Sequence, residues 1–555
     1  MKNKLLTFLI VLLAIAGFNL LAKRFFFRID LTEEKRYTIS KATQNLLENL
    51  DDEVYVKVYL TGKSIPGGFK RLENAVQETL EEFQIHAGSK IKYRFVDLYD
   101  EVKDEKKRNK IFIELAQKGI PPTNVLDKEN GHQVQTLIAP GALITYKDKE
   151  VAVLLLKGNK LASPQEILNQ SYEGVEYQLA SAIKQLTLQE KKKIGFFINY
   201  SHLPAVNQLS LIGSLKKFYE LYPVDLRNSP TLDGLDAIFV LKPDTPFSDN
   251  DKYKIDQFIM NGGKALFFMN SVKIDTVARE GNLAQPLSVN LEDMLFKYGV
   301  RLNFNLIKDA QMCAAIPMDV GNFGNRNNIQ MVPWVYFPLI NTFGNSPIVR
   351  NLDAIYTKYV GSIDSVKAPG ITKTPLLMTS AYTQVINAPA TLSYDIAGKE
   401  INPAQYNAGS KTIAYLLEGS FQSLFLNRIL SDDPRAKTFQ HKGKSTKIIV
   451  CSDGNIPTND FDIQKNTPLP VGFDKFSGNT FANKDFILNA IDYLLDENGV
   501  ISARNKEVTL RPLDKALLQT DRTKWQIINL VIPIGLIILL GLIHNFIRKR
   551  KFEMS

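Results

Sequence analysis

Apolar and polar residues follow one another along the chain in patterns that predict a mixed α/β protein. Residues 53–60, EVYVKVYL, alternate Val and Tyr with charged side chains, which is typical of a strand with one buried face. Ser163 and Pro164, an N-cap residue and a favoured first helical residue, open a long helical pattern over 163–187. Continuous apolar runs such as IGFFI and AIFVL, separated by helical segments, indicate parallel strands buried on both faces.

The order of these elements indicates two domains. Residues 28–160 read β-α-β-α-Pro-β-β, which resembles a thioredoxin-like domain, but C-x-x-C is missing and thiol redox chemistry is excluded there. Residues 192–305 alternate strands and helices, which indicates a Rossmann-like parallel sheet with helices on both faces. The pattern loosens over 306–435 and resumes at STKIIVCSDGN, so we expect one sheet interrupted by an irregular β-rich insertion.

The expected fold class is therefore α/β, membrane-anchored, with two transmembrane helices flanking these domains. The expected divisions are an N-terminal anchor (1–27), the thioredoxin-like domain (28–160), a connecting helix (161–191), the first part of the Rossmann-like domain (192–305), the insertion (306–435), the closing part of the Rossmann-like domain (436–500), a juxtamembrane linker (501–524), a transmembrane helix (525–543) and a basic cytoplasmic tail (544–555).

Two uncharged apolar stretches lie near the ends of the chain. Leu5 to Ala22 is nearly as long as the roughly 20 apolar residues that a helix needs to cross a bilayer. A retained anchor and a signal peptide cleaved near AIA at 14–16 are the two interpretations of this stretch. Trp525 to Ile543 precedes RKRK at 548–551, which places the C-terminus in the cytoplasm. Two spans place the N-terminus there too and leave the body on the periplasmic side of a bacterial inner membrane.

The excess of basic residues lies mainly beside these stretches. The formal net charge is +10, and residues 1–29 and 545–555 hold nine Lys or Arg against Glu553. This distribution is typical of contact with inner-membrane lipid and argues against a nucleic-acid partner. Cys313 and Cys451 both lie in apolar contexts, which leaves two buried thiols or one disulfide as alternatives.

Local motifs for catalysis, metals and nucleotides are missing from the sequence. The five histidines show no zinc-binding spacing, and HKGKSTK at 441–447 has Thr438 where a P-loop needs glycine. We therefore expect no enzymatic activity, no cofactor and no metal. Polar side chains after strands remain candidates for ligand or partner contacts, because ligands of parallel α/β sheets bind at the carboxyl ends of the strands. These candidates are Tyr200, His202, Ser452 and Asp453.

The succession of motifs along the chain resembles a known family. It runs from RIDLTEEKRYTIS (28–40) through LDAIFVLKPDTPFSDNDKYKIDQFIMNGGKALFFMN (235–270), TIAYLLEGSFQSLFLNR (412–428) and NKDFILNAIDYL (483–494) to the C-terminal span. This succession is similar to the membrane-anchored ABC transporter auxiliary proteins of the gliding-motility GldG family of Bacteroidota. Relatives often show a Gly-His-Gly-Glu-like turn where this chain has residues 199–202, NYSH.

The resemblance implies a non-catalytic auxiliary or substrate-engaging subunit that works with a separate ABC ATPase and a multi-span permease, linked to gliding motility or secretion. The alternatives are an envelope scaffold that binds no small ligand and a hydrolase or amidotransferase-like enzyme, which the α/β sheet alone suggests. Asp30, Thr32 and Ser40 are short polar residues able to satisfy backbone N–H groups. We interpret them either as turn and cap residues or as residues that fix the body relative to the membrane and the permease.

Overall fold

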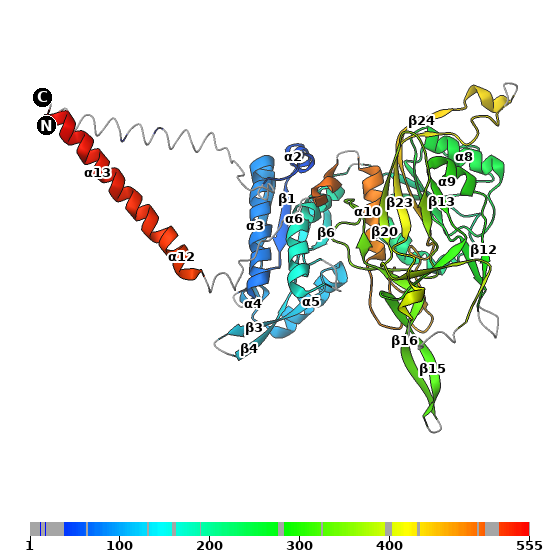
Figure 1. The fold of residues 1–555 in the computed structure, drawn as a ribbon, viewed down its shortest axis with the longest axis horizontal. Coiled ribbons are helices and arrows are strands. Elements are labelled where there is room, and N and C mark those ends of the chain that lie inside the picture. Colours follow the sequence, from blue (N-terminus) through cyan, green and yellow to red (C-terminus); the bar gives the residue numbers. More distant parts are fainter. Residues whose placement is uncertain are drawn as a thin grey trace. The chain divides into compact units, whose positions relative to one another are not determined.

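The chain forms two compact units, Met1–Glu507 and Val508–Ser555. In the first unit an N-terminal α/β domain precedes a larger α/β domain, and helix α6 (Pro164–Thr187) connects them (Figure 1). The computed structural model describes residues 12, 17, 38–62, 65–129, 132–157, 162–188, 190–275, 282–323, 326–393, 402–429, 433–496, 499–505 and 521–553.

The N-terminal domain is built on a four-stranded mixed sheet. Its strand order is β2-β1-β5-β6, with β1 parallel to β2 and antiparallel to β5. This arrangement agrees with the predicted β-α-β-α-β-β order, to which a hairpin of β3 and β4 is added before β5. The elements are α2 (Lys41–Glu48), β1 (Val54–Val58), α3 (Gly67–Ala87), η1 (Gly88–Lys90), β2 (Ile91–Phe95), α4 (Leu98–Glu101), α5 (Glu105–Lys118), β3 (Thr123–Glu129), β4 (His132–Ile138), β5 (Gly141–Tyr146) and β6 (Lys149–Leu154).

An eight-stranded sheet forms the centre of the second domain. Strands β8, β7, β9, β10 and β24 are parallel neighbours in that order, and β23, β20 and β17 continue the sheet in antiparallel fashion. A mixed α/β fold with a mostly parallel central sheet is confirmed. The strands are β7 (Lys193–Phe197), β8 (Glu220–Val224), β9 (Ala237–Leu241), β10 (Lys264–Phe268), β17 (Thr342–Phe343), β20 (Ile371–Met378), β23 (Thr412–Gln422) and β24 (Lys442–Cys451).

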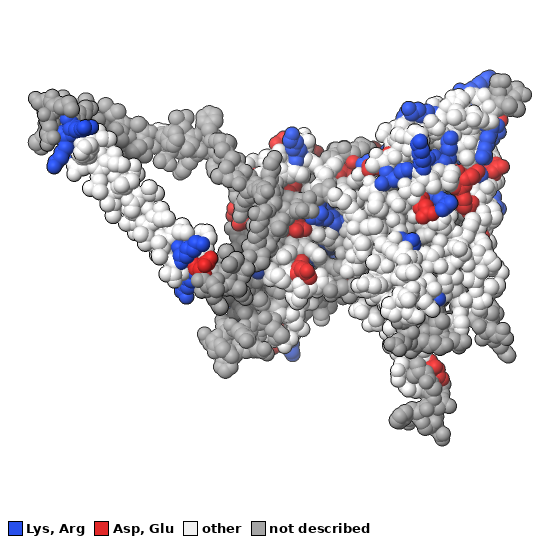
Figure 2. Space-filling model, viewed as in Figure 1, with Lys and Arg blue, Asp and Glu red and all other residues white. Residues whose placement is uncertain are grey.

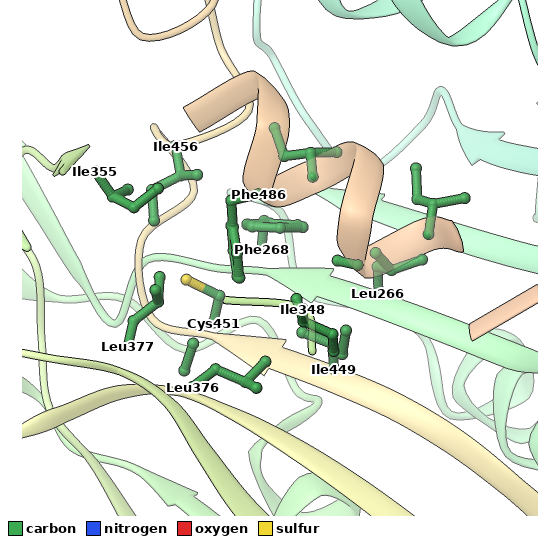
Figure 3. Packing of buried hydrophobic residues seen from close by; sticks show 14 of the residues in the cluster. Leu266, Phe268, Ile348, Ile355, Leu376, Leu377, Ile449, Cys451, Ile456 and Phe486 are labelled. Carbon is green, nitrogen blue, oxygen red and sulfur yellow. The ribbon is translucent and has the colours of Figure 1, made fainter. Parts of the chain in front are cut away.

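Helices cover both faces of this sheet. Leu266 and Phe268 of β10 pack into one core, with α7 (Leu209–Leu215) and α10 (Asn483–Leu495), and the alternate residues Ala265 and Phe267 pack into a second core, with α8 (Asp249–Met260) and α9 (Glu292–Tyr298). Figure 3 shows Phe268 beside Phe486 of α10 in the first core. Burial on both faces explains why these strands are apolar without interruption.

A long two-stranded hairpin extends from the second domain. Strands β15 (Cys313–Phe323) and β16 (Arg326–Ile340) pair in antiparallel fashion and reach beyond the other strands (Figure 1). Ile329 and Met331 are 67% and 47% exposed, whereas Val332 and Trp334 on the other face of β16 are buried. The remaining elements are η2 (Ala205–Asn207), β11 (Val272–Asp275), β12 (Asn282–Pro286), β13 (Val300–Leu302), β14 (Asn305–Asp309), β18 (Ile355–Tyr356), β19 (Ile363–Ser365), β21 (Thr383–Asn387), β22 (Ala390–Leu392), η4 (Pro403–Gln405), η5 (Pro434–Lys437), β25 (Phe461–Asp462), β26 (Thr467–Pro468) and η6 (Val500–Asn505).

Both cysteines are free thiols, which excludes the disulfide alternative for this structure. Cys451 is buried at the end of β24, where burial raises the pKa of its thiol far above the usual range. Burial also raises the pKa of the half-buried Cys313 to about 11. Because the thiolate is the reactive form, neither cysteine is poised as a nucleophile.

Charged side chains of both signs lie on the second domain. Figure 2 shows Lys and Arg gathered near α8 and β24 with Asp and Glu beside them. Lys252 Nζ lies 3.0 Å from Asp293 Oδ1, and Arg428 lies 3.5 Å from the other oxygen of the same carboxylate. The buried Lys252 and the exposed Arg428 are therefore both paired with one carboxylate.

The second unit contains a long apolar helix. Its elements are α12 (Arg522–Gln526), the π-helical turn η7 (Ile527–Val531) and α13 (Ile532–Glu553). Residues 522–550 form 29 consecutive helical residues of high mean hydropathy, enough to cross a bilayer, and Trp525 and Ile543 both lie within them. Where two transmembrane helices were predicted, the described residues contain one. The stretch from Leu5 to Ala22 lies outside them, apart from two isolated positions.

Candidate functional site

The loops after β7 and β9 meet where the chain changes direction in the sheet. Strand β7 has β8 on one side and β9 on the other, so the connection after β7 leads to β8 in one direction and the connection after β9 leads to β10 in the opposite direction. Such switch points are the usual ligand sites of open α/β sheets. Ser201 Oγ donates a hydrogen bond of 2.8 Å to the carbonyl of Lys242, and His202 Nδ1 lies 2.8 Å from Asp244 Oδ1. These contacts fix the two loops against each other.

The predicted contact residues Tyr200 and His202 have different surroundings. Tyr200 is buried, its ring stacks on Phe247 with centroids 3.8 Å apart, and its hydroxyl donates to Asp251. The His202 side chain is 84% exposed beside Asp244. Of these two residues, His202 is therefore the one accessible to a partner or ligand, and Tyr200 anchors the loop.

Ser452 and Asp453 are both buried just after β24. Ser452 Oγ donates to the carbonyl of Gly361 at 2.6 Å. The Asp453 carboxylate accepts backbone N–H groups from Lys358 at 3.0 Å and from Asn455 at 2.7 Å. Burial raises the pKa of Asp453, and the hydrogen bonds from these N–H groups oppose that rise. Both side chains therefore hold the loop after β24 in place.

Lys242 and Asn455 are two further polar residues at this end of the sheet. Neither belongs to a sequence motif that would have predicted its role. Lys242 Nζ donates to Asn455 Oδ1 at 2.6 Å, and Asn455 Nδ2 donates to Asp453 Oδ1 at 2.8 Å. Burial lowers the pKa of Lys242, and the Asp453 carboxylate opposes that change. The available signal is a lysine immediately after the apolar strand AIFVL.

The backbone conformation at Lys242 and Gly454 allows the loops after β9 and β24 to lie close together. Lys242 adopts a left-handed φ of +43°, which is uncommon for a residue other than glycine and carries strain. A Cβ at Gly454 would lie 2.8 Å from Lys242 Cγ, so a larger residue there would force the two loops apart. We call Lys242, Lys358, Asp453 and Asn455 the carboxyl-end cluster.

The carboxyl-end cluster offers charge and hydrogen bonds rather than an assembled nucleophile and base. Lys358 Nζ lies 3.5 Å from Asp460 Oδ2. The ammonium group of Lys242 donates to the side-chain amide oxygen of Asn455 and is attracted by the carboxylate of Asp453. Within the part of the chain that the structure describes, no histidine is hydrogen-bonded to a serine or cysteine side chain, and no three His, Cys, Asp or Glu side chains converge as a metal site. The arrangement is suited to holding a polar or anionic group.

Ser40 lies far from this cluster along the chain and caps α2. Its Oγ accepts the Thr43 N–H at 3.2 Å, and its own N–H donates to Glu176 Oε1 of α6 at 2.7 Å. Ser40 is therefore a helix-cap residue, which is one of the two interpretations given above. Its hydrogen bond to Glu176 also connects α2 with α6. Asp30 and Thr32 lie outside the described residues.

Exchanging Asp453 for asparagine is expected to change how stability depends on pH. Because the folded-state pKa of Asp453 is raised, its favourable contribution is complete below the unfolded value of about 3.9 and is lost as pH rises through the folded value. The free energy of unfolding of the wild type minus that of Asp453→Asn should therefore increase as pH falls from 7 toward 4.5. Urea unfolding of both proteins at the two pH values measures this difference, and a constant or falling difference would contradict the assignment.

Comparison with known proteins identifies the family. A family model described as ABC-type uncharacterized transport system matches residues 191–490, more than half of the chain. The chain belongs to this family. It is thus an auxiliary component of an ABC-type transport system, and the family name implies association with such a system. The matched range contains all strands of the eight-stranded sheet and the whole carboxyl-end cluster.

Other similarities of this transport auxiliary protein carry less functional information. A model described as a domain of unknown function, DUF7088, matches residues 33–145. An uncharacterized protein of Borreliella burgdorferi is 24% identical over 537 residues, which cover 95% of this chain and 94% of the relative. The mmIFT52 N-terminal domain aligns with 55% of this chain and 97% of its own, at 11% identity and a TM-score of 0.29.

Proposed function

We propose that this chain is a non-catalytic auxiliary or substrate-engaging subunit of an ABC transporter linked to gliding motility or secretion. The family match over residues 191–490 carries the proposal. The C-terminal apolar helix supports a membrane-bound subunit, and the basic residues near its end favour a cytoplasmic C-terminus. In this proposal the folded body lies on the periplasmic side of the inner membrane, and a separate ATPase and a multi-span permease supply energy and passage.

A scaffold that joins membrane machinery to envelope components is the second candidate. The hairpin of β15 and β16 favours it, because Ile329 and Met331 present apolar surface on a projecting element. Exposed apolar side chains on such a hairpin are suited to protein contacts. A scaffold role needs no ligand at the carboxyl-end cluster.

Capture of the tagged full chain from mildly solubilised membranes separates these candidates. We expect an ABC ATPase and a multi-span permease to co-purify, identified by mass spectrometry, because the family name implies a transport system. Recovery of envelope proteins without either transporter component would contradict the subunit proposal and favour the scaffold.

A matched pair of variants shows whether the hairpin contributes to capture. The double variant Ile329→Ser/Met331→Ser removes its exposed apolar side chains, and Ile463→Ser removes an 87% exposed side chain elsewhere on the same domain. Loss of captured partners in the double variant, with full capture by Ile463→Ser, would assign the contact to the hairpin.

A further inference from the structure

A cleft lies between the N-terminal domain and the second domain. Its volume is about 440 Å³, within the range of small-molecule sites. One wall comes from the end of β6 and from α6, and the other comes from the loop around Leu352, the segment around Val471 and the start of α10. We propose that this interdomain cleft binds a small amphipathic anion, a molecule with an apolar body and one negatively charged group.

The presence of glycine at position 174 distinguishes this cleft from a packing defect. It lies inside the 24-residue helix α6 and lines the cleft. A glycine inside a helix is destabilising relative to alanine, because more backbone entropy is lost on folding. Its φ is not left-handed, and an added Cβ would meet nothing nearer than Gln178 Cγ at 4.0 Å. Neither the backbone conformation nor the packing around Gly174 requires glycine. The consequence of the missing side chain is additional space in the cleft.

The chemistry of the walls indicates the class of ligand. Apolar surface comes from both domains, including Leu155, Ile167 and Phe481, and suits an apolar body. Lys157 lies 3.8 Å from Asp485 across the cleft, so this pair is largely self-compensated. Lys484 is exposed at the same end and forms no ion pair among the described residues. Asp353 and the buried Arg504 also line the cleft and carry opposite charges, so the charge of Lys484 remains in excess and favours an anionic group on the ligand.

Contacts between the domains hold the cleft open. Asn351 Nδ2 donates to Glu173 Oε2 of α6 at 2.9 Å, and Tyr177 of α6 donates through its hydroxyl to Asp492 of α10 at 3.0 Å. The Arg504 guanidinium is buried over the Tyr177 ring at 5.0 Å. These contacts fix the two walls at one separation, so a ligand enters a largely pre-formed site without the cost of ordering it.

Titration calorimetry with naphthalene-2-sulfonate on the full chain in lipid nanodiscs tests the proposal. This probe has a flat apolar body and one negative charge, and heats from empty nanodiscs are subtracted. We expect saturable binding with a Kd of about 1 mM or lower. Gly174→Leu should weaken it by at least about tenfold, because the new side chain occupies the cleft, and Lys484→Gln should weaken it by about threefold.

Gly213→Leu is the matched control, because Gly213 lies in helix α7, does not line the cleft and also has nothing within 4 Å of an added Cβ. It should bind the probe as the wild type does. Both glycine variants should unfold at or above the wild-type temperature, since leucine is a better helix former than glycine.

Three outcomes would overturn the proposal. They are the absence of saturable binding, unchanged affinity in Gly174→Leu, and equal affinity for the cationic counterpart naphthalen-2-ylmethylammonium. The inference goes beyond the proposed function and can fail independently of it, because the capture of transporter partners does not depend on this probe.

Discussion

Replacing Lys184 by methionine is expected to loosen the junction between α6 and α10 by about 3–5 kcal/mol, the cost of leaving a buried charge without its partner. Lys184 Nζ lies 2.7 Å from Asp496 Oδ1 and 3.7 Å from Asp492 Oδ1. All three side chains are largely buried. Methionine keeps much of the length of lysine but leaves two neighbouring carboxylates facing each other.

The influences on the pKa of Asp492 explain this effect. Burial raises the pKa of Asp492, the ammonium of Lys184 lowers it, and the Asp496 carboxylate raises it. Removing Lys184 removes the main opposing influence, so the pKa of Asp492 should rise further. The damage should therefore be largest at neutral pH and decrease as acid protonates this carboxyl in the folded state.

Hydrogen exchange of the peptides that cover α6 and α10 measures this loosening. A loss of 3–5 kcal/mol corresponds to exchange that is faster by about a hundredfold to a few thousandfold. Lys192→Met is the control, because Lys192 pairs with Asp236 at 3.4 Å with both side chains about one-third exposed, and such pairs contribute about 0–1 kcal/mol. Equal exchange in Lys184→Met and in the control would show that the junction does not depend on this charge.

Elements specified by local chemistry could be read from the sequence. Helix α6 begins at Pro164 after a capping box in which Glu166 N–H donates to Ser163 Oγ and Glu166 Oε2 accepts the Ser163 N–H. Strands β9 and β10 are short and almost wholly buried, and their uninterrupted apolar runs predicted both. In each case residues within a few positions of one another determine the outcome.

Features that depend on distant pairing could not be read in the same way. The stretch 306–435 supplies β17, β20 and β23 to the central sheet. Strand β23 pairs with β24, β20 pairs with β23 and β17 pairs with β20, so their places depend on partners distant in the sequence and not on local pattern. Its Gly- and Asn-rich part lies in the hairpin of β15 and β16.

The candidate site was predicted only in part for the same reason. The strand-end rule correctly located the loops that carry His202 and Asp453 at the carboxyl ends of β7 and β24. Lys242 and Asn455, 213 residues apart, meet only after the sheet has formed. The interdomain cleft likewise joins Lys157 and Asp485 from different domains, and neither residue belongs to a motif.

Phe486→Ala is expected to lower the free energy of unfolding of the second domain by about 3–5 kcal/mol, because it opens a cavity in a closely packed core. Phe486 is fully buried, and its ring meets Phe268 edge-on at 6.3 Å between α10 and the sheet, near Cys451 (Figure 3). Alkylation of Cys451, followed by mass spectrometry, reports the opening of this core, since the buried thiol reacts only when exposed. Its labelling should accelerate by about a hundredfold or more in Phe486→Ala. Phe476→Ala, at a 38% exposed position, should label at nearly the wild-type rate, and equal rates in the two variants would contradict the central role of Phe486 in this core.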